Sequence, residues 1–468
     1  MLGRFGTSTR SATSGAATRV SGETDGGLRA MAQDEEALIR QAKAVLEFNW
    51  TGEYTQPGPR LYPHQWSWDS ALIVLGYAHY DQERAEKELR HLFSAQWKNG
   101  LLPQIVFNPS FHDYFPGPDF WHAKESPEAP ENHKTSGVVL PPAHATAVLA
   151  LYEYAADPGR AKRFLEYVFP KLRAWHEYLY RERDPDGEGL VYIRHPWESG
   201  MDNSPVWDQI MQRMQLGPEE IPDYHRADTN STGPQDRPTS AAYDRFAWLV
   251  KFFADRCYDE ARIRQDCPFL VQDVLFNTLL CRSGWDMARV ARVLGEDPSP
   301  FEEAASRTAK AMNEKLWDEE HGVYLDYDLV ADRPIHVYFG PNFCPLFAGI
   351  PDGARAKRMV EALENSGFGL ANEDVTPVPT YDTHGFGFSP VQYWRGPVWI
   401  NIDWFLMHGF EDYGYTGHAE RLRRTIVDLC GHSGFYEHFD PVSAQGHGSV
   451  LFSWSAALLL DVLMGKRR

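Results

Sequence analysis

The sequence predicts an all-α protein built as a toroid of antiparallel helical pairs. Apolar residues recur at helical spacing in about a dozen stretches of the chain. Tight turns join most of these stretches, and strand-like alternation is short and local. A chain of 468 residues can bury a large core, and helical hairpins packed side by side can form it as a ring.

The helices are expected in a regular order along the chain. A first helix over 33–48 places Ala37, Ala42 and Leu46 on one apolar stripe. A helical pair follows at 69–80 and 83–97, with the break at Tyr80-Asp81. Later helices are expected at 143–156, 159–183, 240–258, 269–294, 300–317, 353–365, 398–411, 416–430 and 454–464. Short strands are expected at 190–194, 323–327 and 335–338.

Three segments interrupt this helical pattern. Residues 1–30 are rich in Ser, Thr, Gly and Arg without apolar periodicity, so we expect a disordered tail before a folded domain at 31–468. A transit peptide would explain the acid-poor start, but a start at Met31 is favoured. The segments 98–142 and 196–239 are dense in Gly, Pro and aromatic residues and longer than ordinary loops, which indicates a lid or cap.

Composition excludes several function classes. The formal net charge of −19 opposes binding to duplex DNA or to an anionic membrane. No apolar run is long enough to span a bilayer. The five cysteines contain no CxxC pair, so a thiolate zinc site is not expected. Scattered, odd-numbered cysteines without a secretion signal indicate reduced thiols in a cytoplasmic protein.

The segment 62–70 has the composition of a sugar-binding platform. It reads YPHQWSWDS and precedes a helix. Tryptophan faces stack on the C–H face of a pyranose, and a carboxylate such as Asp69 accepts hydrogen bonds from hydroxyls. Asp69 could also simply cap the helix, and both roles are compatible.

Two further segments offer carboxyl groups in unusual settings. Glu198 and Asp202 lie four residues apart in the loop HPWESGMDNSP (195–205). Such a loop can press a carboxyl against an aromatic wall and raise its pKa, as a general acid requires. Glu437 lies among aromatic residues in GFYEHFDP, where a carboxylate is either paired or functional.

The segment YWRGPVW (393–399) combines architecture with a charged group. Pro397 suits the start of a helix. Arg395, beside Tyr393 and Trp394, could bind an oxyanion or sugar hydroxyls, or pair with a buried carboxylate.

Taken in order, these motifs resemble glycoside hydrolase family 63. WSWDS, HPWESGMDNSP, RPT…YDR (237–245), YWRGPVW and the Glu437 segment carry the resemblance, which covers about residues 33–464. Within the family, the chain is most similar to the bacterial mannosylglycerate and glucosylglycerate hydrolases. The resemblance implies an (α/α)6 barrel with long aromatic lid loops, and an inverting α-glycosidase that needs neither metal nor organic cofactor.

The resemblance also assigns roles to individual residues. Asp202 would be the general acid and Glu437 the general base, with carboxyls about 6.5–9.5 Å apart to admit a water molecule. Arg237 matches an arginine that binds the glycerate carboxylate, although a structural ion pair is an equally good interpretation. The implied substrate-binding residues are Tyr62, Trp66, Trp68, Asp69, Gln104, Tyr114, Trp197, Gly200, Arg237, Tyr243, Tyr393, Trp394, Arg395 and Trp399.

Two positions depart from the family pattern. Leu140 stands where the family has a polar glutamine in SGITQPP, and Phe452 replaces the glutamine that glucosylglycerate hydrolases carry before Ser-Trp. Loss of a hydrogen-bonding amide changes selectivity strongly. The two changes leave the acid and the base unaffected. The choice between mannose and glucose as the sugar, and between glycerate and a neutral aglycone, stays open.

Other functions remain as alternatives. An α-glucosidase acting on a small neutral disaccharide would use the same acid and base. A sugar epimerase would need paired histidines, for which His64, His144, His384 and His438 are present, whereas a terpene cyclase would need a DDxxD motif that the sequence lacks. A non-catalytic sugar-binding protein would keep the tryptophans and lose a carboxyl. The expected partner is a small glycoside, with a homo-oligomer possible.

Overall fold

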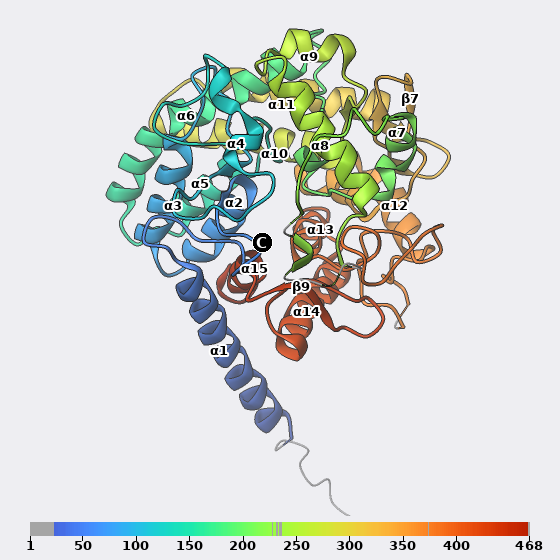
Figure 1. Ribbon diagram of the computed structural model, residues 1–468. Coiled ribbons are helices and arrows are strands. Elements are labelled where there is room, and N and C mark those ends of the chain that lie inside the picture. Colours follow the sequence, from blue (N-terminus) through green and yellow to red (C-terminus); the bar gives the residue numbers. More distant parts are fainter. Residues whose placement is uncertain (1–22, 227, 231–232, 234–235, 373, 467–468) are drawn as a thin grey trace, which may run out of the picture.

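The structure is a computed structural model that describes residues 23–466 except 227, 231, 232, 234, 235 and 373. Its centre is a closed ring of inner helices (Figure 1). In ring order these are α2 (Ser67–Tyr77), α5 (His144–Glu153), α10 (Val274–Leu294), the 3₁₀ segment η7 (Gly340–Ala348), α13 (Ile400–Asp412) and α15 (Ser453–Met464). Each packs against the next, and α15 returns to α2. The (α/α)6 barrel expected from the sequence is confirmed.

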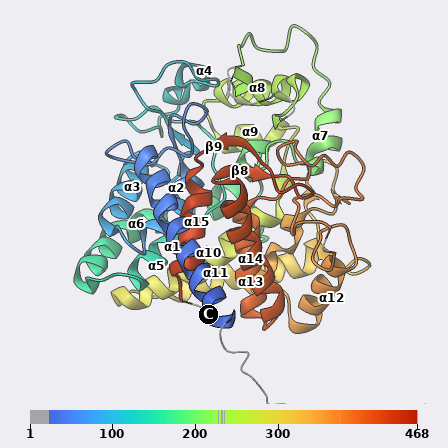
Figure 2. The same ribbon diagram turned by 90° about the horizontal axis from the view of Figure 1, so that it is seen from below.

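An outer layer of helices covers this ring. It contains α1 (Glu23–Asn49), α3 (Gln82–Ser94), α6 (Pro158–Arg183), α11 (Ser299–Ala311), α12 (Gly353–Glu364) and α14 (Thr416–Ser433). Most outer helices pack on the inner helix next to them in sequence. The N-terminal helix α1 instead packs along α15, the last helix of the chain (Figure 2). Further helices cap one end: α4 (Pro118–Trp121), α7 (Asp208–Arg213), α8 (Ser240–Ala254) and α9 (Glu260–Asp266).

Short antiparallel strands tie the loops together. The strands are β1 (Gln65–Trp66), β2 (Ile105–Val106), β3 (Val271–Gln272), β4 (Trp317–Asp318), β5 (Val323–Tyr324), β6 (Tyr327–Asp328), β7 (Arg333–Pro334), β8 (Tyr436–Phe439) and β9 (Gly446–Val450). They form the pairs β1–β2, β4–β5 and β8–β9 and the sheet β3–β6–β7. The pair β1–β2 sets Trp66 opposite Ile105.

Several predicted boundaries shift for identifiable reasons. The helix expected over 269–294 begins at Val274, because Val271 and Gln272 pair with β6 and the Asp273 side chain caps the helix. The helix expected over 300–317 ends at Ala311 in a π-helical turn. The strand predicted at 335–338 is wrong, since β7 ends at Pro334. Only Ile193 of the segment 190–194 forms a bridge, with Val271.

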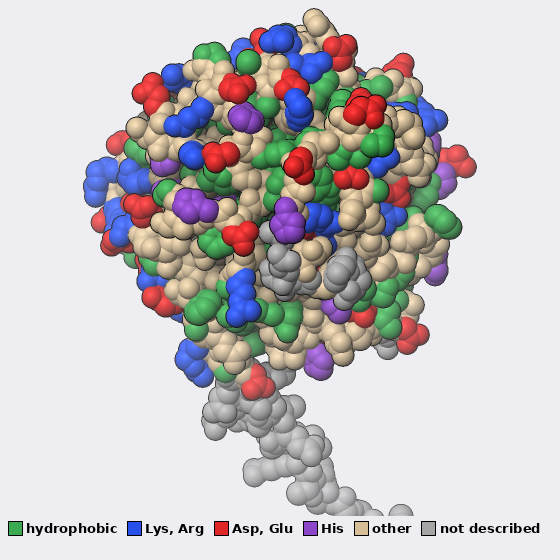
Figure 3. Space-filling view, in the orientation of Figure 1, with side chains coloured by type: hydrophobic (Ala, Val, Ile, Leu, Met, Phe, Trp, Pro, Cys, Tyr) green, Lys and Arg blue, Asp and Glu red, His purple; other side chains and the backbone are tan. Residues whose placement is uncertain are grey.

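The N-terminal helix is longer than expected. It begins at Glu23, so residues 23–30 belong to α1 and not to an unstructured tail. Residues 1–22, the rest of the expected tail, lie outside the described residues. None of the described helices combines the length and the apolar character that a membrane span needs. Acidic and basic side chains are interspersed on the face drawn in Figure 3.

The inner helices share one polarity, which places the site. Trp66 and Asp69 lie at the start of α2, Trp399 immediately precedes α13, and Phe452 immediately precedes α15. The N-terminal ends of these helices therefore meet at one end of the barrel. Helix N-termini carry partial positive charge, which favours carboxylates and hydroxyl oxygens at that end.

Candidate active site

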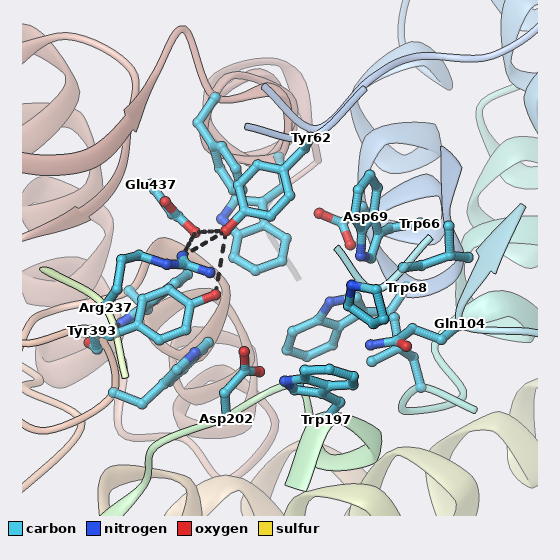
Figure 4. Close-up of a pocket in the computed structure, with 18 of the residues that line it drawn as sticks. Tyr62, Trp66, Trp68, Asp69, Gln104, Trp197, Asp202, Arg237, Tyr393 and Glu437 are labelled. Atoms are coloured by element: carbon cyan, nitrogen blue, oxygen red, sulfur yellow. Dashed lines mark hydrogen bonds and ion pairs between the residues drawn. The ribbon is translucent and has the colours of Figure 1, made fainter. Parts of the chain in front are cut away.

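A pocket opens at the end of the barrel where the inner helices begin (Figure 4). Its empty space, including the part open to solvent, is about 660 Å³. Its lining comprises Tyr62, Trp66, Trp68, Asp69, Gln104, Ile105, Tyr114, Phe115, Pro116, Leu140, Trp197, Gly200, Asp202, Arg237, Tyr243, Tyr393, Trp394, Trp399, Glu437, Phe452 and Trp454. Every residue predicted for the site lies there except Arg395.

Some residues of the lining were not predicted from the sequence. Ile105 follows Gln104 and is placed by its pairing with Trp66 across β1–β2. Phe115 and Pro116 follow Tyr114 in the DYFPGP stretch, whose aromatic content was the available signal. Both long insertions contribute to the lining, which is compatible with their predicted role as a lid.

Aromatic rings form most of the pocket wall. Trp394 and Trp399 stack with ring centroids 3.8 Å apart, and Trp68 meets Trp454 edge to face at 5.2 Å. Gly200 passes directly over the Trp68 indole, with φ +73°. A Cβ there would come within 2.5 Å of the ring, so only glycine lets the loop approach this closely.

Asp69 projects into the pocket from the first turn of α2. Burial raises its pKa well above the usual value, and the negative charges of Glu437 and Glu88 add to the effect. The neutral carboxyl is thereby favoured, and it can both donate and accept hydrogen bonds with sugar hydroxyls.

Asp202 lies on the loop that follows the 3₁₀ segment Pro196–Ser199, and it is partly exposed to the pocket. Burial raises the pKa of its carboxyl to about 7, against the lowering effect of Arg237. The nearby Glu437 raises it further. Asp202 therefore holds a proton over much of the acidic and neutral pH range, as a proton donor must.

Glu437 enters from β8 and is surrounded by hydrogen-bond donors. Its Oε1 accepts a hydrogen bond from the Tyr62 hydroxyl at 2.5 Å and lies 3.7 Å from the Arg237 guanidinium. Its Oε2 accepts the backbone N–H of Ser449 at 2.9 Å. Burial still raises the pKa of Glu437, but all three contacts oppose that rise and favour the ionised form.

Arg237 connects the base to the rest of the polar wall. Its guanidinium donates to the Tyr62 hydroxyl at 3.0 Å and to Asp228 at 3.3 Å, and it lies over the Tyr393 ring at 4.3 Å. Both interpretations of this arginine therefore find support, because it forms ion pairs and also lines the pocket.

Glu198, the other acid of the 195–205 loop, faces away from the pocket lining. It accepts two hydrogen bonds from Arg183, at 2.8 and 2.9 Å. The backbone N–H groups of Arg194 and Val139 donate to it at 2.7 and 3.2 Å. These partners lower its pKa despite full burial, so Glu198 is a structural anion.

Arg395 is not among the described residues that line the pocket, contrary to the prediction. Its guanidinium forms a two-point ion pair with Asp208, at 2.8 and 2.7 Å. Pairing with a buried carboxylate was one of the alternatives for this residue, but the partner found, Asp208, is half-exposed. The motif could not indicate on which side of the Tyr393–Arg395 turn the side chain lies.

Comparison with known proteins agrees with this geometry. Residues 62–455 match the model of the mannosylglycerate hydrolase MGH1-like glycoside hydrolase domain. The chain belongs to this family. It is 64% identical to a mannosylglycerate hydrolase of Rubrobacter radiotolerans over 92% of this chain and 97% of the relative. It is 34% identical to a glucosylglycerate hydrolase of Mycolicibacterium hassiacum over 91% of this chain and 97% of the relative.

A solved structure shows the same architecture. The GH63 mannosylglycerate hydrolase of Thermus thermophilus, in complex with Tris and D-glycerate, superposes with a TM-score of 0.84 at 43% identity. The match covers 90% of this chain and 99% of the solved chain. Family 63 membership, expected from the motifs, is confirmed. The protein is a glycosidase.

Proposed function

We propose that this glycosidase hydrolyses mannosylglycerate with inversion at the anomeric carbon, using Asp202 as general acid and Glu437 as general base. The observation that carries the proposal is the electrostatic contrast between the two carboxyls of one pocket. Asp202 has a pKa of about 7, and Glu437 has three contacts that favour its charge. Acid and base roles follow when two environments separate the protonation states of paired carboxyls.

The proposed reaction accounts for each proton. Asp202 donates its proton to the glycosidic oxygen as the bond from C1 to that oxygen breaks. Glu437 removes a proton from a water molecule, whose oxygen forms the new bond to C1 on the opposite face. Sugar and glycerate leave, and a net transfer of one proton from Glu437 to Asp202 through solvent restores the enzyme. Asp69 would hydrogen-bond the sugar hydroxyls.

The identity of the aglycone rests on Arg237 and on the relatives. A buried guanidinium in the lining gives an anionic aglycone a partner that a neutral disaccharide would lack. Relatives over nearly the whole chain are named for mannosylglycerate. Glucosylglycerate is the second candidate, because one relative is named for it. Leu140 and Phe452, which replace glutamines of the family pattern, lie in the lining where they could discriminate between the sugars.

A substrate panel tests the proposal. Purified enzyme should release glycerate from mannosylglycerate with a higher kcat/KM than from glucosylglycerate, and should leave neutral α-linked disaccharides almost intact. Asp202→Asn and Glu437→Gln should each abolish turnover while retaining the circular dichroism spectrum of the parent. Preferential cleavage of a neutral disaccharide, or near-parental rates in either variant, would overturn the assignment.

We also infer that the enzyme acts in the cytoplasm. All five cysteines are free thiols, and four of them are buried. Burial raises the pKa of Cys267, Cys281 and Cys430 to about 12, so these thiols are unreactive. Free thiols are typical of a reducing compartment. Labelling of a fractionated source cell with an antibody would test the inference, and a signal outside the soluble fraction would contradict it.

A further inference from the structure

The loop that carries Asp202 is largely buried, but Asp202 itself borders two pockets. Asp202 lines the active-site pocket and also a second cavity behind it. This second pocket is open to solvent and is bordered by Asn203, Asp208, Gln392 and Arg395. A side chain beside empty space can move into it unless other contacts fix its backbone.

Polar contacts from the 393–395 turn supply that support. The backbone N–H of Trp394 donates to Asn203 Oδ1 at 2.9 Å. Arg395 donates to the backbone carbonyl of Asn203 at 3.4 Å while its guanidinium forms the two-point ion pair with Asp208. The Arg395 side chain thus contacts both Asn203, which directly follows Asp202, and Asp208 at the start of α7.

The turn that presents Arg395 is itself under constraint. Tyr393 adopts a left-handed backbone with φ +48°, which is unfavourable for a bulky residue. Its carbonyl accepts the Trp399 indole N–H at 3.0 Å, and the N–H of Arg395 donates to the Gln392 carbonyl at 2.9 Å. The arginine therefore projects from a turn fixed at both ends, which makes it a rigid anchor for the acid loop.

We propose that Arg395 is a positioning residue for the general acid, holding Asp202 at the leaving-group side of the pocket through its contacts with Asn203 and Asp208. This inference rests on the proposed function, because it presupposes that Asp202 donates a proton to the leaving group. It gives the arginine of YWRGPVW a role outside sugar binding. A displacement of about 1 Å in a catalytic group lowers rates about a hundredfold.

Substrates that differ in their need for acid catalysis test the proposal. An alkoxide leaving group such as glycerate requires protonation, whereas fluoride departs from α-mannosyl fluoride with little assistance. Arg395→Gln should lower kcat/KM for mannosylglycerate about 10- to 100-fold, yet change kcat/KM for the fluoride less than about threefold. Arg395→Lys keeps the charge but loses the two-point geometry, so it should restore only part of the loss.

The controls separate the possible failures. Arg213→Gln removes another two-point ion pair, which Arg213 forms with the more buried Asp328 and not with the acid loop, so it should leave the ratio of the two rates unchanged. Equal losses on both substrates, or no loss, in Arg395→Gln would overturn the positioning role. Asp202→Asn is measured in parallel. If it lowers kcat/KM for α-mannosyl fluoride as much as for mannosylglycerate, Asp202 is not the general acid.

A second variant covers poor folding of Arg395→Gln. Asp208 is half-exposed, so Asp208→Asn removes the ion pair from the other side with less risk to the fold. It should show the same selective loss on mannosylglycerate, with a smaller magnitude because the contact between Arg395 and Asn203 persists. Retention of the parental rate ratio in Asp208→Asn would contradict the proposal.

Discussion

Glu198 and Asp202 lie four residues apart in one loop, but their surroundings move their pKa values in opposite directions. Glu198 is fully buried, and Arg183 and Arg194 lower its pKa. Asp202 borders the pocket and forms no ion pair with a described residue; burial raises its pKa to about 7 despite the lowering effect of Arg237. In this loop the guanidinium partners, and not the depth of burial, determine which acid is structural and which is available for chemistry.

The buried ion network gives this contrast its physical basis. Glu198 and Glu260 together pair with Arg183 and Arg194, so the two acids balance two cations. The described lining of the pocket instead contains three carboxyls, Asp69, Asp202 and Glu437, and one cation, Arg237, which also pairs with Asp228. With fewer cations than carboxyls, the pocket favours protonation of some of its acids, whereas the network keeps Glu198 ionised.

The largest effect is expected when the carboxyl of Asp202 is removed. Asp202→Asn should reduce kcat on mannosylglycerate by a factor of about 10³ or more, because general acid catalysis contributes up to about 10⁴. Its thermal midpoint should match or exceed that of the parent, since the variant removes a carboxyl whose ionisation the fold disfavours. Differential scanning calorimetry with steady-state kinetics checks both. A strongly lowered midpoint would assign Asp202 a structural role.

The second largest effect, on stability, is expected when the charge of Glu198 is removed. Glu198→Gln should lower the free energy of unfolding by about 3–5 kcal/mol, because it leaves buried guanidinium charge without its counterion. Urea titration at pH 7 measures this loss. The pKa of Glu198 is lower in the folded than in the unfolded protein, so its contribution to stability is fully present above the unfolded-state pKa and is lost as the pH falls through the folded-state pKa. Glu177→Gln, at an exposed position of α6, is the control and should change stability by less than about 0.5 kcal/mol. Equal effects in the two variants would contradict the account.

The third prediction sharpens the contrast with pH. The protonated form of Asp202 is active, so kcat/KM should fall as the pH rises through about 7. The ionised form of Glu437 is active, so the rate should also fall as the pH drops below its raised pKa. A narrow bell-shaped profile is expected from initial rates between about pH 4 and 9. A flat profile across the alkaline range would show that no acid of this kind is required.

The smallest expected effect concerns the support of the base. Tyr62→Phe removes the hydroxyl that donates to Glu437, so the pKa of Glu437 should rise and the acidic limb should move to higher pH. Hydrogen bonds to charged groups contribute about 1.5–3 kcal/mol, so a loss of about tenfold or more in kcat/KM is expected at pH 6. Tyr393→Phe is the matched comparison, because its hydroxyl contacts Tyr62 and not Glu437. An unmoved acidic limb in Tyr62→Phe would refute this role.

Sequence patterns predicted the helices well because helical periodicity is local. The failures occurred where distant contacts decide the backbone: Val271 and Gln272 leave the predicted helix because they pair with β6. The site shows the same division. Trp66, Trp68 and Asp69 could be predicted from the composition of a segment beside a helix start. The hydrogen bond from Tyr62 to Glu437 could not, because it joins residues 375 positions apart. Arg395 was misplaced because a motif does not specify the direction of a side chain from a turn.

We expect Asp202 and Glu437 to act from opposite sides of the sugar, with a water molecule at the base. Proton NMR of mannosylglycerate hydrolysis, recorded faster than mutarotation, tests it most directly. An α-linked substrate should yield β-mannose first, with α-mannose appearing only as the anomers equilibrate. Initial appearance of α-mannose would require a covalent intermediate on a carboxyl and would contradict the assigned roles.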